Sequence, residues 1–252
     1  QSSGTFTSMT CGLGLAEVRD GGGTLSAGTH HACVVTSSGG VVCWGSSDYG
    51  QALASPRMPT DGSSTFVTVS AGGFHTCAVT SRGAVECWGL NRDGESLCVV
   101  PATWSTPCTD GIKEQATDGS TFAMVSAGIG HTCGVTSKGA VDCWGDNTYG
   151  QAPTSAMVPT DGSSTFVTVN CGGTHTCAVT SSGKVECWGN NGSGQFPSSS
   201  STFVAVSTGT SHTCAMNSGG GIECFGSDSD SQVNGVTISS GTTAVSSGMY
   251  HN

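Results

Sequence analysis

Cysteine and histidine are the residues whose number and spacing in this sequence could support chemistry. The 252 residues include 14 cysteines and 7 histidines, which can bind metals, provide reactive thiols or, for cysteine, form disulfides. Ten cysteines form five pairs with a sequence separation of ten: Cys33 and Cys43, Cys77 and Cys87, Cys133 and Cys143, Cys177 and Cys187, and Cys214 and Cys224. The C-x2-C pairs typical of zinc sites do not occur in the sequence. The pattern therefore indicates a disulfide framework formed in an oxidising compartment.

A further ten-residue cysteine spacing lies outside this series, in an insertion at 97–112. Cys98 and Cys108 enclose a segment that contains two prolines and Trp104. A disulfide-closed loop that presents an aromatic side chain is a preorganised contact surface, and aromatic residues are frequent in binding hot spots. We therefore expect Cys98, Trp104 and Cys108 to form the main binding site. The alternative is a loop whose tryptophan packs on its own repeat.

Two cysteines, Cys11 and Cys171, have no partner in this scheme. They could bridge each other across the fold, or one of them could reach another chain. A third alternative is a partner cysteine that follows residue 252. The sequence leaves these three alternatives open.

Six histidines recur at one position of a repeated segment: His31, His75, His131, His175, His212 and His251. One interpretation is a ring of metal ligands. The simpler interpretation is a hydrogen-bonding strut that satisfies buried backbone groups in every repeat. No Ser-His-Asp or Cys-His set stands apart from the repeats. We therefore expect neither an enzyme nor a metal or other cofactor.

These residues are carried by a repeat that covers nearly the whole chain. The segment VSAGGFHTCAVTSRGAVECWGLN recurs in related form; its copies start at Leu25, Val69, Val125, Val169 and Val206. Within each of the best copies, F-V-T-V alternates as a strand does, and two further apolar runs are joined by a T-S-x-G turn. Such a hairpin places the two cysteines of a copy opposite each other, within disulfide reach.

Composition favours short strands and excludes several classes of function. Gly, Ser and Thr fill 111 of 252 positions, which leaves too few helix formers for a helical protein. The formal charge is −10 with only 7 Lys and Arg, so we expect no nucleic-acid partner. No apolar run reaches membrane-spanning length, so we expect no membrane insertion.

The two ends of the sequence predict a closed ring. The chain stops at VSSGMYHN, which matches the start of a repeat as far as His251. In complete copies the second cysteine follows the repeat histidine by twelve residues, as Cys87 follows His75. Counting twelve from His251 across the termini reaches Cys11. A repeat split between the two termini is typical of a β-propeller that closes its ring.

We therefore predict an all-β fold, a single β-propeller of six or alternatively seven blades over residues 1–252, with one hairpin disulfide per blade. The predicted repeats are 25–65, 66–121, 122–165, 166–202 and 203–242, with 243–252 and 1–24 in the closing blade. The repeat tryptophans are expected to pack between blades: Trp44, Trp88, Trp144 and Trp188. Three asparagines are expected to be turn residues of the kind that tolerate left-handed backbone: Asn91, Asn147 and Asn191.

The repeat pattern G-x-x-H-T-C-A-V-T-x-x-G-x-V-x-C-W-G-x-N-x-x-G-Q resembles that of the regulator of chromosome condensation family. The resemblance implies a β-propeller, usually of seven blades, that serves as a platform for partner recognition. The family includes a nuclear exchange factor, plant light sensors and a bacterial inhibitor of β-lactamase. The paired cysteines are more similar to extracellular members, such as ectodomains of crinkly-type plant receptor kinases and secreted microbial proteins. The disulfides, the acidity and the six-blade count depart from the nuclear pattern and argue against exchange-factor and chromatin roles.

The function we expect is that of a secreted or cell-surface, non-enzymatic binding module for an extracellular protein or glycan. One alternative is a structural subunit of an extracellular filament, coat or appendage, in which the chain is its own partner. A second is an inhibitor of a secreted enzyme. The sequence shows no charged-then-apolar stretch at Gln1, and we expect a mature secreted chain whose signal peptide has been removed. The sequon at Asn191 is the expected glycosylation site.

Overall fold

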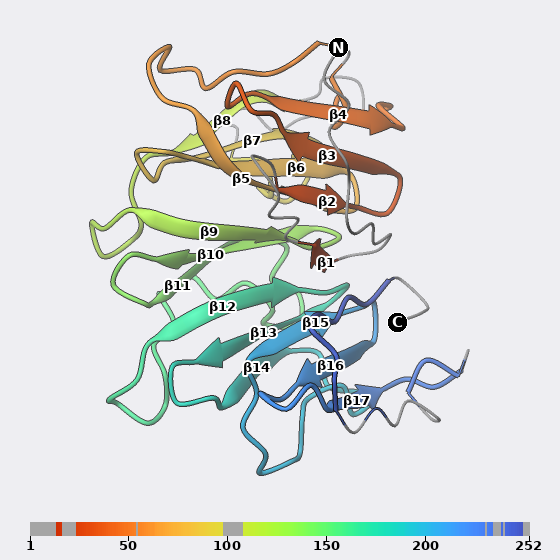
Figure 1. Cartoon of the computed structure of the whole chain (residues 1–252). Coiled ribbons are helices and arrows are strands. Elements are labelled where there is room, and N and C mark those ends of the chain that lie inside the picture. Colours follow the sequence, from red (N-terminus) through yellow and green to blue (C-terminus); the bar gives the residue numbers. More distant parts are fainter. Residues whose placement is uncertain are drawn as a thin grey trace.

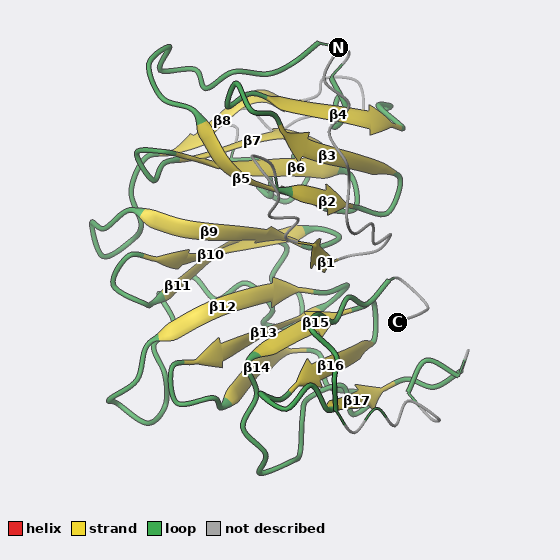
Figure 2. Cartoon of the chain, in the orientation of Figure 1, coloured by secondary structure: helices red, strands yellow, loops and turns green. Residues whose placement is uncertain are grey.

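The computed structural model of the chain describes residues 14–16, 24–53, 55–97, 108–229, 231–233, 238 and 240–248. These residues form strands, turns and loops, and none of them lies in a helix (Figure 2). Small antiparallel sheets recur along the chain in the pattern of propeller blades (Figure 1). The predicted all-β propeller class is therefore confirmed. Within the described part of the chain, no helix is long and apolar enough to cross a membrane.

Five sheets follow one another in chain order. The first two have four strands each: β1 (Gly14–Ala16), β2 (Leu25–Ala27), β3 (His31–Val35) and β4 (Val41–Gly45), then β5 (Phe66–Ala71), β6 (His75–Thr80), β7 (Val85–Gly89) and β8 (Cys108–Lys113). The other three have three strands each: β9 (Phe122–Ala127), β10 (His131–Thr136) and β11 (Val141–Gly145); β12 (Phe166–Cys171), β13 (His175–Thr180) and β14 (Val185–Gly189); and β15 (Ala205–Thr208), β16 (His212–Met216) and β17 (Ile222–Gly226).

The central hairpin of every sheet carries a disulfide. In the second sheet, Cys77 on β6 lies directly opposite Cys87 on β7, and their Cα atoms are 4.1 Å apart. The same bridge joins the other pairs: Cys33–Cys43, Cys133–Cys143, Cys177–Cys187 and Cys214–Cys224. The predicted hairpin disulfide is therefore present in each of the five described sheets, whereas the closing blade lies largely outside the described residues. A loop of about ten residues closed in this way contributes roughly 2–3 kcal/mol in the chain-entropy description.

The fourth strand of the second sheet, β8, was missed by the sequence analysis. It pairs with β7, so that Gly89 faces Cys108 and Val85 faces Lys113. In three other repeats a single residue takes this place by an isolated bridge: Arg57, Met157 and Ile238. These segments carry little strand alternation, because only one or a few residues pair. Periodicity therefore could not reveal them.

The hydrophobic core lies between consecutive blades. The first strands β2, β5, β9, β12 and β15 contact one another in order. At the first junction, the disulfide residue Cys33 and the hairpin residue Val41 pack against Phe66, Val69 and Trp88 of the next repeat. Each blade therefore buries its apolar face against its neighbour rather than within itself.

A row of glycines brings these first strands close together. The Cβ atom of an alanine at position 128 would lie 2.7 Å from the carbonyl oxygen of Gly172. Gly72 stands in the same relationship to Gly128, and Gly209 to Gly248. The repeat glycine is therefore required by close backbone approach between blades.

The C-terminal segment continues the contacts made between repeats. The amide of Ser247 donates to Oγ of Ser207 at 2.8 Å, as the amide of Ala71 donates to Oγ of Ser26 at 2.9 Å. Residues 243–248 thus occupy the place of a further first strand beside β15. Strand β1 pairs with β2 and also contacts β15 (Figure 1).

Several predictions about the ring concern residues outside the described part. Cys11 and His251, on which the argument for closure rests, are among them. The pairing of 6–11 with the C-terminal strand, the blade count and the boundary of the closing blade therefore stay predictions.

Candidate binding face

Two sets of loops share one edge of the blades. One set joins the first two strands of each repeat, and the other follows the repeat tryptophan. The amide of Ser46 donates to the carbonyl of His30 at 2.9 Å, and the amide of Leu90 donates to that of Phe74 at 2.9 Å. The later repeats make the same bond, Asp146 to Gly130 and Asn190 to Thr174. The two sets of loops therefore form one continuous face.

The loops after the tryptophans are fastened to the next blade. The side-chain oxygen of buried Gln51 accepts the amide of Tyr49 at 2.9 Å, which closes its loop. The backbone carbonyl of Gln51 then accepts Nε1 of Trp88 at 3.1 Å and Oγ1 of Thr76 at 2.9 Å. Both donors lie in the following repeat. Each loop is thus held by its own blade and by the next one.

Three repeat tryptophans take the predicted place between blades. Trp144 donates to the carbonyl of Glu95 at 3.1 Å, and Trp188 to that of Gln151 at 2.9 Å. Trp44 differs, since its side chain is 47% exposed. The prediction of interblade packing is therefore wrong for Trp44, and the loop contact made by Trp88 has no counterpart there among the described residues.

The repeat asparagines act through their side chains. Oδ1 of Asn91 accepts the amide of Ser96 at 3.0 Å, and Oδ1 of Asn191 accepts the amide of Phe196 at 2.9 Å. The left-handed residue of these loops is the following glycine, such as Gly94 with φ 88°. The expectation of left-handed backbone at the asparagines is therefore wrong. Their role is to bridge the loop.

The repeat histidines are struts between blades. In four of them, Nε2 lies beside Oγ1 of a threonine in the next repeat: His31 and Thr76 at 2.8 Å, His75 and Thr132 at 2.7 Å, His131 and Thr176 at 2.8 Å, and His175 and Thr213 at 2.8 Å. Thr76 already donates to the carbonyl of Gln51, so its oxygen accepts from the imidazole. Nε2 of His31 therefore carries a proton.

Burial keeps these rings neutral. It lowers the pKa of His31 to about 4, a shift to which His30 adds, and that of His75 to about 3. The pKa of His131 is likewise lowered to about 4 and that of His175 to about 3, mainly by burial. A buried imidazolium would lose its hydration, and at His131 the charge of Asp146 offsets only part of that cost. His251, the sixth repeat histidine, lies outside the described residues.

The second repeat has a carboxylate where others have an amide. Glu95 is 1% exposed and takes the place of Gln51, Gln151 and Gln195. Its two oxygens accept the amides of Arg92 at 3.2 Å and Asp93 at 2.7 Å. Burial raises the pKa of Glu95. This unusual residue lies immediately before the insertion.

The insertion opens on the same face as these loops. It leaves the second repeat after Leu97, whose φ is 63°, and returns at Cys108, the residue of β8 that faces Gly89. Cys108 is buried and disulfide-bonded. Cys98 and Trp104 lie outside the described residues, so their role as the binding site stays a prediction.

An aromatic cluster lies on this face beside the first two repeats. The ring of Phe74 lies 5.4 Å from the ring of His30 and 5.4 Å from that of Tyr49. His30 is exposed, whereas Phe74 and Tyr49 are partly buried. The members of this cluster occupy variable positions of the repeat, so the repeat pattern does not reveal them. Asn191, the predicted glycosylation site, is exposed on the same set of loops.

The opposite edge of the blades carries an open cleft of about 420 Å³ between the fourth and fifth repeats. Val167, Val179, Phe203 and Val204 provide most of its apolar wall. Val167 and Val204 are 52% and 51% exposed.

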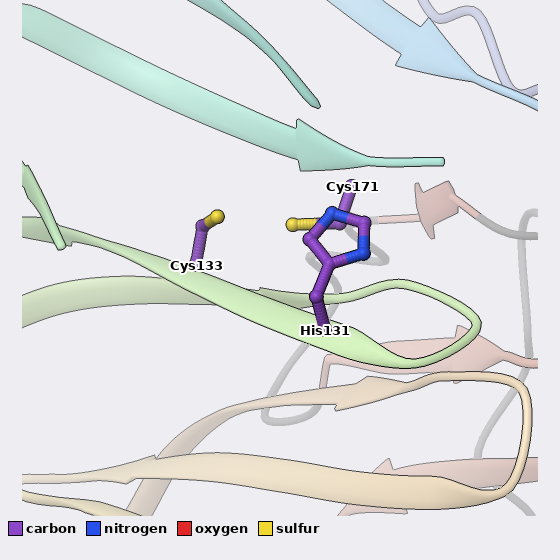
Figure 3. Close-up of side chains that lie close together, drawn as sticks. All are labelled: His131, Cys133 and Cys171. Atoms are coloured by element: carbon purple, nitrogen blue, oxygen red, sulfur yellow. The ribbon is translucent and has the colours of Figure 1, made fainter. Parts of the chain in front are cut away.

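A sulfur-rich cluster lies between the third and fourth repeats (Figure 3). One ligand atom each of His131, Cys133 and Cys171 lies within 4.8 Å of the others. Cys133 is bonded to Cys143, and Nε2 of His131 is bonded to Thr176. A metal would need thiolates, and the sulfur of Cys133 is held in a disulfide. The cluster in this state therefore does not fit a metal site.

Cys171 is a free, buried thiol. Of the three alternatives for the two unpaired cysteines, a bridge between Cys171 and Cys11 is thus not formed, and burial keeps Cys171 from reaching another chain. Cys11 itself lies outside the described residues.

Comparison with known proteins agrees with this geometry. The model of the regulator of chromosome condensation (RCC1) repeat matches residues 24–51, 66–95, 125–151 and 166–195. No curated protein matches the chain in sequence.

Solved structures of similar fold include plant receptor ectodomains and yeast RCC1. The ectodomain of the receptor kinase CR4 from Physcomitrella patens is 21% identical, with a TM-score of 0.63 over 90% of this chain and 56% of that chain. The ectodomain of the Arabidopsis thaliana receptor kinase ACR4 is 24% identical, with a TM-score of 0.59 over 81% of this chain and 65% of that one. Yeast RCC1 (Prp20) bound to Kap60 is 16% identical, with a TM-score of 0.66 over 81% of this chain and 56% of that one. The chain thus spans a little over half of the moss ectodomain and of the yeast protein. It is a β-propeller that contains four RCC1-type repeats, and each of its five described sheets carries one disulfide.

Proposed function

We propose that this protein is an extracellular binding module that recognises a partner protein through the face that carries the insertion. The observation behind the proposal is that both ends of the insertion, Leu97 and Cys108, open beside the loops after the tryptophans. Binding residues are often carried by loops that a rigid scaffold positions. The long insertion and the fixed loops would then act on the same partner.

The scaffold beneath this face favours preorganised binding. Each loop is bonded to its own repeat and to the next one, as the contacts of Gln51 illustrate. Loops held in this way lose little conformational entropy when a partner binds. The aromatic cluster of His30, Tyr49 and Phe74 would add contact area next to the insertion.

The disulfides support an extracellular location. Five described hairpins each contain a disulfide, and disulfides persist mainly in oxidising compartments. The similar CR4 and ACR4 structures are ectodomains. The structure of yeast RCC1 with Kap60 is an example of a protein with this fold that binds another protein.

A non-enzymatic role fits the use of the repeat histidines. A general base must keep a nitrogen accessible to substrate. His75 and His131 are instead fully buried and bonded to threonines of the next blade. These residues stabilise the platform on which recognition would take place.

Binding to the surface of cells from the source organism tests the proposal. Fluorescently labelled protein should bind saturably, and Trp104→Ala and Phe74→Ala should each weaken binding about tenfold or more if they are hot-spot residues. Val167→Ser, in the cleft on the opposite edge, is the matched control and should bind as the wild type does.

Two outcomes would contradict this proposal. If Val167→Ser loses binding while Trp104→Ala and Phe74→Ala retain it, the opposite cleft is the interface. If the protein forms ordered polymers in electron micrographs and shows no saturable binding, it is a structural subunit.

A further inference from the structure

The fourth repeat places a free thiol against the disulfide of the third. Cys171 ends β12 and is 2% exposed. Its Sγ lies within 4.8 Å of Sγ of Cys133, and the two sulfur atoms point toward each other in Figure 3. Cys133 is in turn bonded to Cys143. Three sulfur atoms are therefore close together at this junction.

This arrangement distinguishes one junction from the others. The residue at the equivalent position is alanine in three repeats, Ala27, Ala71 and Ala127, and Thr208 in the fifth. At the first junction, Ala71 belongs to the same core cluster as the disulfide residue Cys33. At this position other repeats have a methyl group that packs against a disulfide. Cys171 instead places there a thiol that can react with the disulfide.

We propose that the thiol of Cys171 exchanges with the 133–143 disulfide. The exchange forms a 133–171 disulfide and leaves the free thiol on Cys143. In this step, Sγ of Cys171 as thiolate bonds to Sγ of Cys133. The bond between Cys133 and Cys143 breaks, and Cys143 leaves as thiolate. Cys171 loses one proton to solvent and Cys143 gains one, so the step consumes no oxidant or reductant.

The exchange moves a thiol from the core toward the surface. Cys171 is buried, whereas Cys143 is only partly buried. The new 133–171 bridge would join the third and fourth blades covalently. The thiolate of Cys143 could then attack a soluble disulfide, retain half of it as a mixed disulfide and release the other half as a thiol. Cys143 is thereby a site for modification by low-molecular-weight disulfides.

The surroundings of Cys171 keep the exchange slow in the closed junction. Burial raises the pKa of Cys171 to about 12, although hydrogen bonds with Ser126 and Thr176 act in the opposite direction. His131 on β10 is the titratable side chain beside it. Nε2 of His131 donates to Thr176, because Thr176 itself donates to the carbonyl of Gln151. Burial lowers the pKa of His131 to about 4, so its other ring nitrogen is a weak acceptor for the thiol proton. The exchange therefore needs hydroxide or transient opening of the junction.

The test uses the full oxidised chain with oxidised glutathione at pH 7.5 and pH 9, followed by an acid quench and mass mapping of non-reduced peptides. Cys171→Ala, which restores the residue found at Ala71 and Ala127, is the matched variant. In the wild type, glutathione should appear on Cys143 together with a 133–171 bridge. The rate should rise about 30-fold between the two pH values, in proportion to the thiolate. Cys171→Ala should acquire no glutathione at Cys143.

Three results would overturn the proposal. Glutathione on Cys171 with the 133–143 bridge intact would show that Cys171 attacks oxidised glutathione directly and does not exchange with the hairpin disulfide. Equal labelling of Cys143 in Cys171→Ala would show that a thiolate other than that of Cys171 opens the hairpin disulfide. No adduct on Cys143 at pH 9 would show that the exchange does not occur.

Discussion

Nε2 of His75 lies 2.7 Å from Oγ1 of Thr132 in the following repeat. Thr132 in turn donates to the carbonyl of Glu95 at 3.2 Å, the same carbonyl that accepts Nε1 of Trp144. One buried chain of hydrogen bonds thus links a core histidine to the loop that precedes the insertion. The same hydrogen bonds therefore stabilise both the blade junction and the candidate binding face.

Removal of this strut should destabilise the protein. His75→Ala leaves a cavity and takes away the donor to Thr132, at a cost of about 2–4 kcal/mol. His30→Ala, which removes an exposed imidazole, should change stability by about 0.5 kcal/mol or less. Urea denaturation of both variants measures the difference. Equal stability of the two would mean that the strut contributes nothing.

Acid should destabilise the fold through the buried histidines. Burial holds the pKa of His75 at about 3 and that of His131 at about 4, whereas the unfolded chain takes up these protons near pH 6.5. Since the unfolded state binds more protons between these values, stability rises with pH in that window and is lost as pH falls from about 6.5. Each histidine should cost about 2 kcal/mol between pH 7 and pH 5.

Urea denaturation at pH 7 and pH 5 checks this dependence. His75→Gln should reduce the loss of stability on acidification, because one proton fewer is taken up on unfolding. An unfolding free energy that is the same at both pH values would refute the assignment of neutral buried histidines.

Restoring the repeat pattern around Glu95 should stabilise the second blade. Gln151 donates its side-chain amide to Oδ2 of Asp146 at 2.9 Å, but the residue equivalent to Asp146 in the second repeat is Leu90. Burial raises the pKa of Glu95, so its contribution to stability is lost as pH rises through the folded value. The double variant Leu90→Asp/Glu95→Gln should therefore gain about 1 kcal/mol at pH 7.

The single variants provide the control for this gain. Glu95→Gln alone should gain less, because its amide nitrogen lacks the acceptor that Asp146 provides in the third repeat. Denaturation of the four proteins gives the coupling energy. A double variant that is less stable than either single variant would show that the second loop is built differently.

Loss of one hairpin disulfide should weaken the blade and its neighbours. Cys177→Ala/Cys187→Ala removes a bridge whose sulfurs pack against Val206 of the next repeat, and should cost about 2–3 kcal/mol. Hydrogen exchange should increase in β12 to β16, because the fourth and fifth blades share this interface. Faster exchange confined to the 177–187 hairpin would contradict a core shared between blades.

Much of the fold could be predicted from sequence because the repeat encodes each hairpin locally. The T-S-x-G turn and the ten-residue cysteine spacing determine which residues face each other, as Cys77 and Cys87 do. Contacts that depend on three dimensions were not visible. The hydroxyl of Thr132 is an ordinary strand residue in the sequence, and only packing places it beside His75.

The candidate site was predictable only in part. The insertion was visible as a break in the repeat. The strand at its end, β8, was not visible, because it is defined by pairing with β7. The aromatic cluster around Phe74 was not visible, because its members come from different loops of two repeats. Cys171 stood out by count, but its position beside Cys133 follows from packing between blades.

Hydroxyl-radical footprinting of the protein, free and bound to cells of its source organism, tests the central claim most directly. Oxidation of Trp104, Tyr49 and Phe74 should fall severalfold on binding, because the partner would cover the face that carries the insertion. Oxidation of Val167 and Val204, on the opposite edge, should stay unchanged. Protection of the two valines with continued oxidation of the aromatic residues would contradict recognition through the insertion face.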